Sequence, residues 1–255
     1  MLSSFNKSLL ALALGTAAFG ALAALPAGVT CKVSTPAAKT AYQKAYEQAL
    51  WGKWQSFEER DVQLGGFAEP DTSPRYHLLM KRPGAQPAAD KPLILFLHGF
   101  PEFSWAWETW LQRFGSQYDS IAIDLKGYGN SSLPTDVAAY KNTRLSDELD
   151  ALIDCMGYTQ VIPVAHDWGA GLAWAFAMRH PERMKAMVIL STPHPYTYAR
   201  ELAQPGSEQQ QRSQYIVDIR SGKVKDVLSL GASAGAGSTT LLTLPFYKGA
   251  RLNRL

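Results

Sequence analysis

The stretch VIPVAHDWGAG, residues 161–171, places an aspartate between an apolar run and a helix-like pattern. Ala165 and Gly169 lie two residues before and two residues after Asp167. A strained strand-to-helix turn that presents a nucleophile needs small residues at these positions, because the two backbones approach closely there. The pattern therefore predicts that Asp167 is a nucleophile at the tip of such a turn. The alternative is an aspartate that only caps the following helix.

An aspartate at this position suits one kind of reaction. With a reference pKa of about 3.9 it is ionised at neutral pH, so it can attack a saturated carbon without a base. The product is an ester, and its hydrolysis by water needs a general base and an oxyanion hole. In this kind of turn the hole is formed by two backbone N–H groups. We assign them to Trp168, after the nucleophile, and to Phe100, after the apolar run LILFLHG.

Several neighbours of these residues are expected to shape the site. His98, Gly99 and Pro101 belong to the loop that carries Phe100, and His166 precedes the aspartate. His98 is more simply explained as a hydrogen-bonded structural residue than as a proton-transfer group. The Trp168 indole N–H can also line the pocket. Since no group of His, Cys, Asp and Glu has ligand spacing and no glycine-rich loop fits a nucleotide, we expect neither metal nor cofactor.

Short apolar runs alternate with amphipathic patterns from residue 92 onward. This alternation predicts a doubly wound α/β fold with a mostly parallel sheet, in which functional residues gather at the carboxyl ends of the strands. The segments 57–64 and 75–82 look like two preceding strands. The later strands are predicted at 92–98, 120–125, 160–165 and 184–190, and helices from 104, at 143–156, at 171–180 and within 207–230.

Four motifs in this pattern resemble the soluble epoxide hydrolase branch of the α/β-hydrolase superfamily, with haloalkane and haloacid dehalogenases as near relatives. They are HGFPEFSWAW, IDLKGYGNSS, HDWG and HPERMKAMVILSTPHP. The resemblance covers about residues 57–220. It implies a small apolar organic substrate, an epoxide or an alkyl halide, and Glu102 in HGFPE favours the epoxide. It also implies a cis Phe100–Pro101 peptide.

The resemblance further implies a helical cap that begins near residue 191, with a cap tyrosine that donates a hydrogen bond to the epoxide oxygen. Tyr215 matches that tyrosine by its place in the early cap; the alternative is an ordinary aromatic residue of an amphipathic helix. The family pattern continues with two more strands and a late base histidine, and none of the five histidines, at 77, 98, 166, 180 and 194, matches that position. The sequence thus predicts a truncated chain, with its last strands missing, whose Asp167 ester is released poorly. A non-catalytic remnant or binding protein is the alternative.

The N-terminal residues differ from the rest of the chain. After Lys7 no charged residue occurs before Lys32, and Ala21-Leu22-Ala23 suits a signal peptidase. We expect export to the periplasm or the medium; an uncleaved membrane anchor is the alternative. The predicted division is a signal peptide at 1–24, an N-terminal extension helix within 25–56, the first part of the hydrolase core at 57–193, and the start of the cap with a tail at 194–255.

Charge and cysteine content limit the partners. The 25 basic and 22 acidic residues are intermixed and give a net charge of +3, so no phosphate-binding surface and no nucleic-acid partner is expected. The sequence leaves the oligomeric state open. Cys31 and Cys155 are the two cysteines. In an oxidising compartment an even count permits one disulfide between them. We nevertheless expect both to remain unpaired, because nothing in the sequence brings their Cα atoms within bridging distance.

Overall fold

The computed structural model describes residues 25–37, 57–88 and 91–221, which form one mixed seven-stranded sheet in the order β1-β2-β3-β5-β4-β6-β7. The strands β5, β4, β6 and β7 are parallel, and β1, β2 and β3 join them as antiparallel neighbours. Their bounds are β1 Thr30–Ser34, β2 Glu58–Gly65, β3 Arg75–Lys81, β4 Leu93–Leu97, β5 Ser120–Ile123, β6 Val161–His166 and β7 Val188–Leu190.

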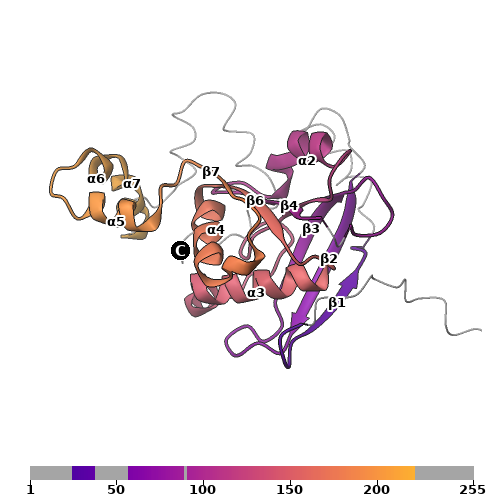
Figure 1. Ribbon diagram of the computed structural model, residues 1–255. Coiled ribbons are helices and arrows are strands. Elements are labelled where there is room, and N and C mark those ends of the chain that lie inside the picture. The colour runs from indigo at the N-terminus through magenta and orange to yellow at the C-terminus, as the bar shows by residue number, and fades with distance from the viewer. Residues whose placement is uncertain (1–24, 38–56, 89–90, 222–255) are drawn as a thin grey trace, which may run out of the picture.

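Helices cover both faces of the sheet, and a small group of helices follows β7 (Figure 1). The first group consists of η1 Ser104–Trp107, α2 Glu108–Phe114, η2 Val137–Tyr140, α3 Asn142–Cys155, α4 Asp167–Arg179 and η3 Pro181–Arg183. The second group consists of α5 Pro195–Leu202, α6 Glu208–Arg212 and α7 Gln214–Arg220. Figure 1 shows this second group standing apart from the layered core, beyond the β7 edge. The doubly wound α/β fold predicted from the sequence is confirmed.

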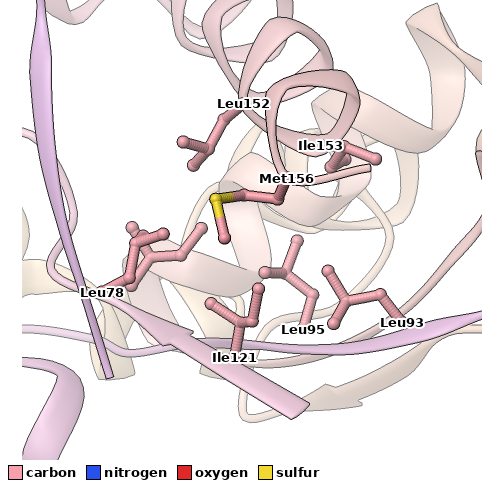
Figure 2. Close-up of a pocket in the computed structure, with 8 residues that line it drawn as sticks. Leu78, Leu93, Leu95, Ile121, Leu152, Ile153 and Met156 are labelled. Carbon is pink, nitrogen blue, oxygen red and sulfur yellow. The ribbon is translucent and has the colours of Figure 1, made fainter. Parts of the chain in front are cut away.

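The central strands are apolar because helices enclose them on both sides. All residues of β4 and β5 are buried, as expected for strands of a sheet that is covered on two faces. Their side chains divide between two cores, one against α3 and α4 and the other against η1 and α2. A cavity of about 10 Å³ between the sheet and α3 is lined only by apolar side chains. Figure 2 shows these side chains, with Met156 among them. Without polar partners the cavity does not hold an ordered water, so it belongs to the core.

Two elements differ in extent from the sequence prediction. The last predicted strand, 184–190, pairs with β6 as a strand only over Val188–Leu190. Met184, directly after η3, contributes a single isolated bridge to Val161. The helix predicted from residue 171 begins earlier, at Asp167, so the turn with the candidate nucleophile is the first turn of α4 itself.

The N-terminal segment contributes a strand that the sequence did not predict. Residues Thr30–Ser34 form β1, which pairs antiparallel with β2 over its whole length. The predicted extension helix falls mainly on residues 38–56, and the predicted signal peptide falls on residues 1–24; both ranges lie outside the described residues. Among the described helices, none combines the length and the hydrophobicity needed to cross a bilayer.

The prediction of two unpaired cysteines was wrong. Cys31 in β1 and Cys155 at the end of α3 form a disulfide, with their Cα atoms 6.0 Å apart. Pairing with β2 holds β1 at the edge of the sheet, and α3 packs against both strands, so the two thiols meet. This proximity depends on how a strand and a helix 124 residues apart pack together, and neither local pattern contains that information.

Candidate active site

Asp167 lies at the junction of β6 and α4 in a strained backbone conformation. Its φ is +50°, whereas His166 before it is extended. A non-glycine residue in the left-handed region costs about 1–3 kcal/mol and is retained where the surrounding structure enforces it. The strained turn expected from the sequence is confirmed.

Two glycines allow this turn to approach the loop after β4. A Cβ on Gly169 would lie 2.4 Å from the Leu97 carbonyl oxygen and 2.5 Å from the His98 carbonyl oxygen. The Gly169 N–H donates to the His98 carbonyl at 3.0 Å. A Cβ on Gly99 would lie 2.4 Å from the Cβ of Asp167. The glycines therefore bring α4, the aspartate and the β4 loop into direct contact.

One of the two carboxylate oxygens of Asp167 accepts a hydrogen bond from the protein. The Phe100 N–H donates to its Oδ1 at 2.9 Å, and the Phe100–Pro101 peptide is cis, as the resemblance implied. Within the part of the chain that the structure describes, Oδ2 has no hydrogen-bond partner. The Trp168 N–H lies in the first turn of α4, where amides have no acceptor inside the helix. Of the two amides assigned to the oxyanion hole, the structure thus shows the Phe100 N–H in contact with the carboxylate.

His98 is a structural part of the loop after β4. Its ring is fully buried, its Nδ1–H donates to the Gly99 carbonyl at 2.8 Å, and its Nε2 accepts from the Leu125 N–H at 3.0 Å. These partners fix one neutral tautomer, and burial lowers the pKa of His98 against the opposing hydrogen bond to Gly99. Both ring nitrogens are occupied, which agrees with the structural explanation preferred from the sequence.

Glu102 and His166 form a contact that the sequence analysis did not find. The His166 Nδ1–H donates to Glu102 Oε2 at 3.3 Å, and the same oxygen accepts from the Gly99 N–H at 3.1 Å. Glu102 thereby ties the loop that carries Phe100 to the end of β6. The motif HGFPE was the available signal, but the contact joins residues 64 positions apart.

Tyr215 lies in α7 with its side chain about half-exposed. Desolvation raises the pKa of its phenol, and the charge of Asp167 and the neighbouring Tyr198 raise it further. The charge of Asp167 therefore acts on Tyr215. Tyr198 in turn contacts Ser213 at 2.9 Å, which joins α5 to the segment just before α7.

Thr192, directly beyond β7, also contacts the turn and was missed by the sequence analysis. Its hydroxyl Oγ1 donates to the backbone carbonyl of Asp167 at 3.2 Å. The Trp174 indole N–H donates to the carbonyl of Thr192 at 3.3 Å, so α4 holds this residue from a second side. Ser191 before it has a φ of +65°. The sequence offered no signal for Thr192, since a threonine after a strand is unremarkable.

The remaining three histidines are engaged by other groups. The Nδ1–H of His77 donates to Asp61 at 2.9 Å between β3 and β2. His180 at the end of α4 lies close to Asp150. His194 caps α5 by accepting the Tyr196 N–H at 3.2 Å. Each of these rings is thus engaged by groups other than the Asp167 carboxylate. Across the described ranges, no group of three His, Cys, Asp or Glu residues could hold a metal ion.

Comparison with known protein families gives one match that covers more than half of the chain. The sequence profile of the "alpha/beta hydrolase fold" family matches residues 92–237, which include Asp167 and the loop before it. Among curated proteins, the chain is 39% identical over 108 residues to epoxide hydrolase 4 of Mus musculus, which covers 42% of this chain and 30% of that protein. It is 37% identical over 138 residues to epoxide hydrolase 3 of Xenopus tropicalis, which covers 53% of this chain and 36% of that protein. The chain thus spans about a third of the length of these curated relatives.

Solved structures give a longer match. A product complex of an epoxide hydrolase variant from Bacillus megaterium superimposes with a TM-score of 0.56 at 29% identity, over 71% of this chain and 69% of that one. An epoxide hydrolase from metagenomes of hot environments gives a TM-score of 0.57 at 29% identity, over 69% of this chain and 56% of that one. The product in the Bacillus complex is a naphthyloxy-propanediol.

Proposed function

The chain belongs to the alpha/beta hydrolase fold family, and from this premise we propose that it performs epoxide hydrolase chemistry with Asp167 as nucleophile. The observation that carries the proposal is the Asp167 carboxylate at a strained turn, with Oδ1 held by the Phe100 N–H and Oδ2 left to react. A helix-capping aspartate would instead direct its carboxylate at the amides of its own helix. The similarity to epoxide hydrolases in sequence and structure supports the same chemistry.

The first step of the proposed reaction is alkylation of the enzyme. Oδ2 of the ionised carboxylate attacks one carbon of the epoxide, the carbon–oxygen bond of the ring breaks, and the ring oxygen accepts a proton or a hydrogen bond. Tyr215 is the proposed donor, because its raised pKa keeps the phenol protonated at neutral pH. The product is an ester between Asp167 and the opened substrate.

The second step is hydrolysis of this ester. Water attacks the ester carbonyl carbon, and negative charge develops on Oδ1, which already accepts the Phe100 N–H. The Trp168 N–H is the proposed second donor to this oxygen. The bond between the carbonyl carbon and Oδ2 then breaks, and Oδ2 leaves with the diol. One proton of the water passes to this departing oxygen and the other to the ring-opened oxygen or back to the Tyr215 phenolate. The carboxylate is restored from Oδ1 and the water oxygen. Because the five histidines of these 255 residues are engaged elsewhere, we expect ester hydrolysis to be slow and alkylation to be unaffected.

The proposed substrate is a small apolar organic epoxide. Trp168 directly follows Asp167, and the pKa of Tyr215 responds to the charge of Asp167. Both rings are about half-exposed and offer aromatic surfaces to a substrate. Neither carries a charge, so apolar groups on the epoxide are favoured over ionised ones. An alkyl halide would use the same aspartate, and it serves as a comparison in the experiment below.

The experiment is intact-mass spectrometry of the 255-residue chain incubated with an aryl epoxide such as styrene oxide, with an aryl-alkyl chloride in parallel. We expect about one equivalent of epoxide per chain, located by peptide mapping on Asp167, and little further turnover. Asp167→Asn should form no adduct, since an amide is a poor nucleophile. Asp136→Asn is the matched control, because Asp136 caps η2 and asparagine also caps helices. An adduct on Asp167→Asn, or none on the unaltered chain, would refute the proposal. An adduct from the chloride alone would indicate dehalogenase chemistry.

We also propose that the protein is exported. The uncharged stretch after Lys7 supports this proposal. The Cys31–Cys155 disulfide supports it independently, because disulfides persist in oxidising compartments and are rare in the cytosol. Cell fractionation with an antibody against the core tests the proposal, and recovery of reduced, full-length protein from the cytosol would contradict it.

A further inference from the structure

The hydroxyl of Thr192 contacts the same peptide unit that carries a proposed oxyanion donor. Oγ1 of Thr192 donates at 3.2 Å to the carbonyl oxygen of Asp167. That carbonyl belongs to the peptide bond between Asp167 and Trp168, whose N–H is the Trp168 amide. Because a carbonyl oxygen only accepts, the direction of the hydrogen bond is fixed.

A hydrogen bond to a peptide carbonyl polarises the whole peptide unit. It draws electron density toward the carbonyl oxygen, which makes the N–H at the other end of the same unit a stronger donor. It also restrains rotation of the peptide plane, which follows a residue with a φ of +50°. The direction of the Trp168 N–H therefore depends in part on the position of Thr192.

The position of Thr192 is itself fixed by α4. The Trp174 indole N–H donates to the Thr192 carbonyl at 3.3 Å. The Trp174 ring also packs edge-on against His194, with ring centroids 4.7 Å apart. The first residues beyond β7, which lead into α5, are thereby anchored to α4, the helix that begins at Asp167.

We propose that Thr192 is a positioning residue that orients and polarises the Trp168 N–H for stabilisation of the oxyanion. This inference rests on the proposed function of Asp167 as nucleophile. It makes a step-specific prediction, since the oxyanion forms on Oδ1 when the ester is attacked and does not form during alkylation. Loss of the hydroxyl should slow release of the ester and leave alkylation unchanged.

The test follows the Asp167 adduct by intact mass after excess epoxide is removed, with hydroxylamine as the attacking reagent. Its nitrogen bonds to the ester carbonyl carbon, Oδ1 becomes the oxyanion, and the ester carbon–oxygen bond then breaks. A proton moves from nitrogen to the departing oxygen, so the diol leaves and a hydroxamate remains on Asp167. This reaction passes through the same oxyanion and needs no histidine.

Thr192→Val removes the hydroxyl and keeps the shape of the side chain. We expect release of the adduct to slow about fivefold, which corresponds to one neutral hydrogen bond of about 1 kcal/mol. Formation of the adduct should stay within about twofold, because that step forms no charge on Oδ1. Thr192→Ser restores the hydroxyl and should restore the release rate. Thr159→Val, at an exposed threonine before β6, is the matched control and should change neither rate.

A second measurement does not depend on catalysis. With ¹⁵N-labelled tryptophan, the backbone amide resonance of Trp168 is identified by its loss in Trp168→Phe. It should move upfield in Thr192→Val and return in Thr192→Ser, because the carbonyl hydrogen bond polarises this amide. Equal slowing of alkylation and release, or an unmoved Trp168 resonance, would overturn the inference. If the unaltered chain forms no adduct while the resonance moves as expected, the proposed reaction has failed and the role of Thr192 in setting the amide stands.

Discussion

Reduction of the Cys31–Cys155 disulfide should lower the stability of the protein without changing the chemistry of Asp167. The bridge joins residues separated by 124 positions. In the chain-entropy treatment, a loop of this size adds about 5 kcal/mol to the free energy of unfolding, and measured values are usually nearer 2–4 kcal/mol. Since domains are stable by only about 5–15 kcal/mol in total, the loss should be large.

The bridge lies far from the candidate site in the topology of the sheet. β1 is an edge strand, and the sheet order places β2, β3, β5 and β4 between β1 and β6. Cys155 ends α3 just before the amino end of β6, whereas Asp167 follows its carboxyl end. Reduction should therefore leave the rate of epoxide labelling at Asp167 unchanged under native conditions.

The assay is urea unfolding followed by tryptophan fluorescence, with and without reductant, together with a count of free thiols. We expect a decrease of about 2–4 kcal/mol in the free energy of unfolding on reduction. The Cys31→Ala/Cys155→Ala protein is the control, because its unfolding should not respond to reductant. An unchanged unfolding curve after both thiols have been titrated as free would refute the reasoning. Parallel loss of labelling in native buffer would refute the separation of the bridge from the site.

Two further predictions concern the turn and the antiparallel strands. Gly169→Ala should destabilise the protein by about 1–3 kcal/mol and suppress labelling of Asp167, because the new Cβ would meet two backbone carbonyls. Gly171→Ala is the control, because nothing lies within 4 Å of a Cβ at that position. In unfolding measurements it should stabilise the protein by up to about 1 kcal/mol through α4. His77 and Asp61 form a partly buried pair. Burial lowers the pKa of His77, but the hydrogen bond to Asp61 and the nearby carboxylates outweigh it, so this pKa is raised. Burial raises the pKa of Asp61, but His77 and Arg75 outweigh it, so this pKa is lowered. The stabilisation from the protonated His77 is thus complete below its ordinary pKa of 6.5 and is lost as pH rises through the higher folded-state pKa. The stability advantage over His77→Gln, measured by urea unfolding, should therefore shrink as the pH is raised above about 6.5. An advantage that grows with pH would contradict the assignment.

The sequence by itself determined the features that depend on neighbouring residues. Continuous apolar runs predicted β4, β5 and β6, because a strand covered on both faces has no polar side. The small residues around Asp167 predicted the strained turn, because the requirement for close backbone approach acts on residues two positions away. The motif HGFPE after β4 likewise predicted which loop amide would reach the carboxylate, and the Phe100 N–H does so.

Only the tertiary structure decided the contacts between distant segments. Pairing of Cys31 with Cys155 requires that β1 add to the edge of the sheet and that α3 lie across its face. The contact between Glu102 and His166 and the hydrogen bond from Thr192 to Asp167 likewise join the ends of different strands. Residue type limits what such groups can do, but their distances follow from strand order and helix packing. Strand order and helix packing are set by burial of the whole core, and no local stretch of sequence determines them.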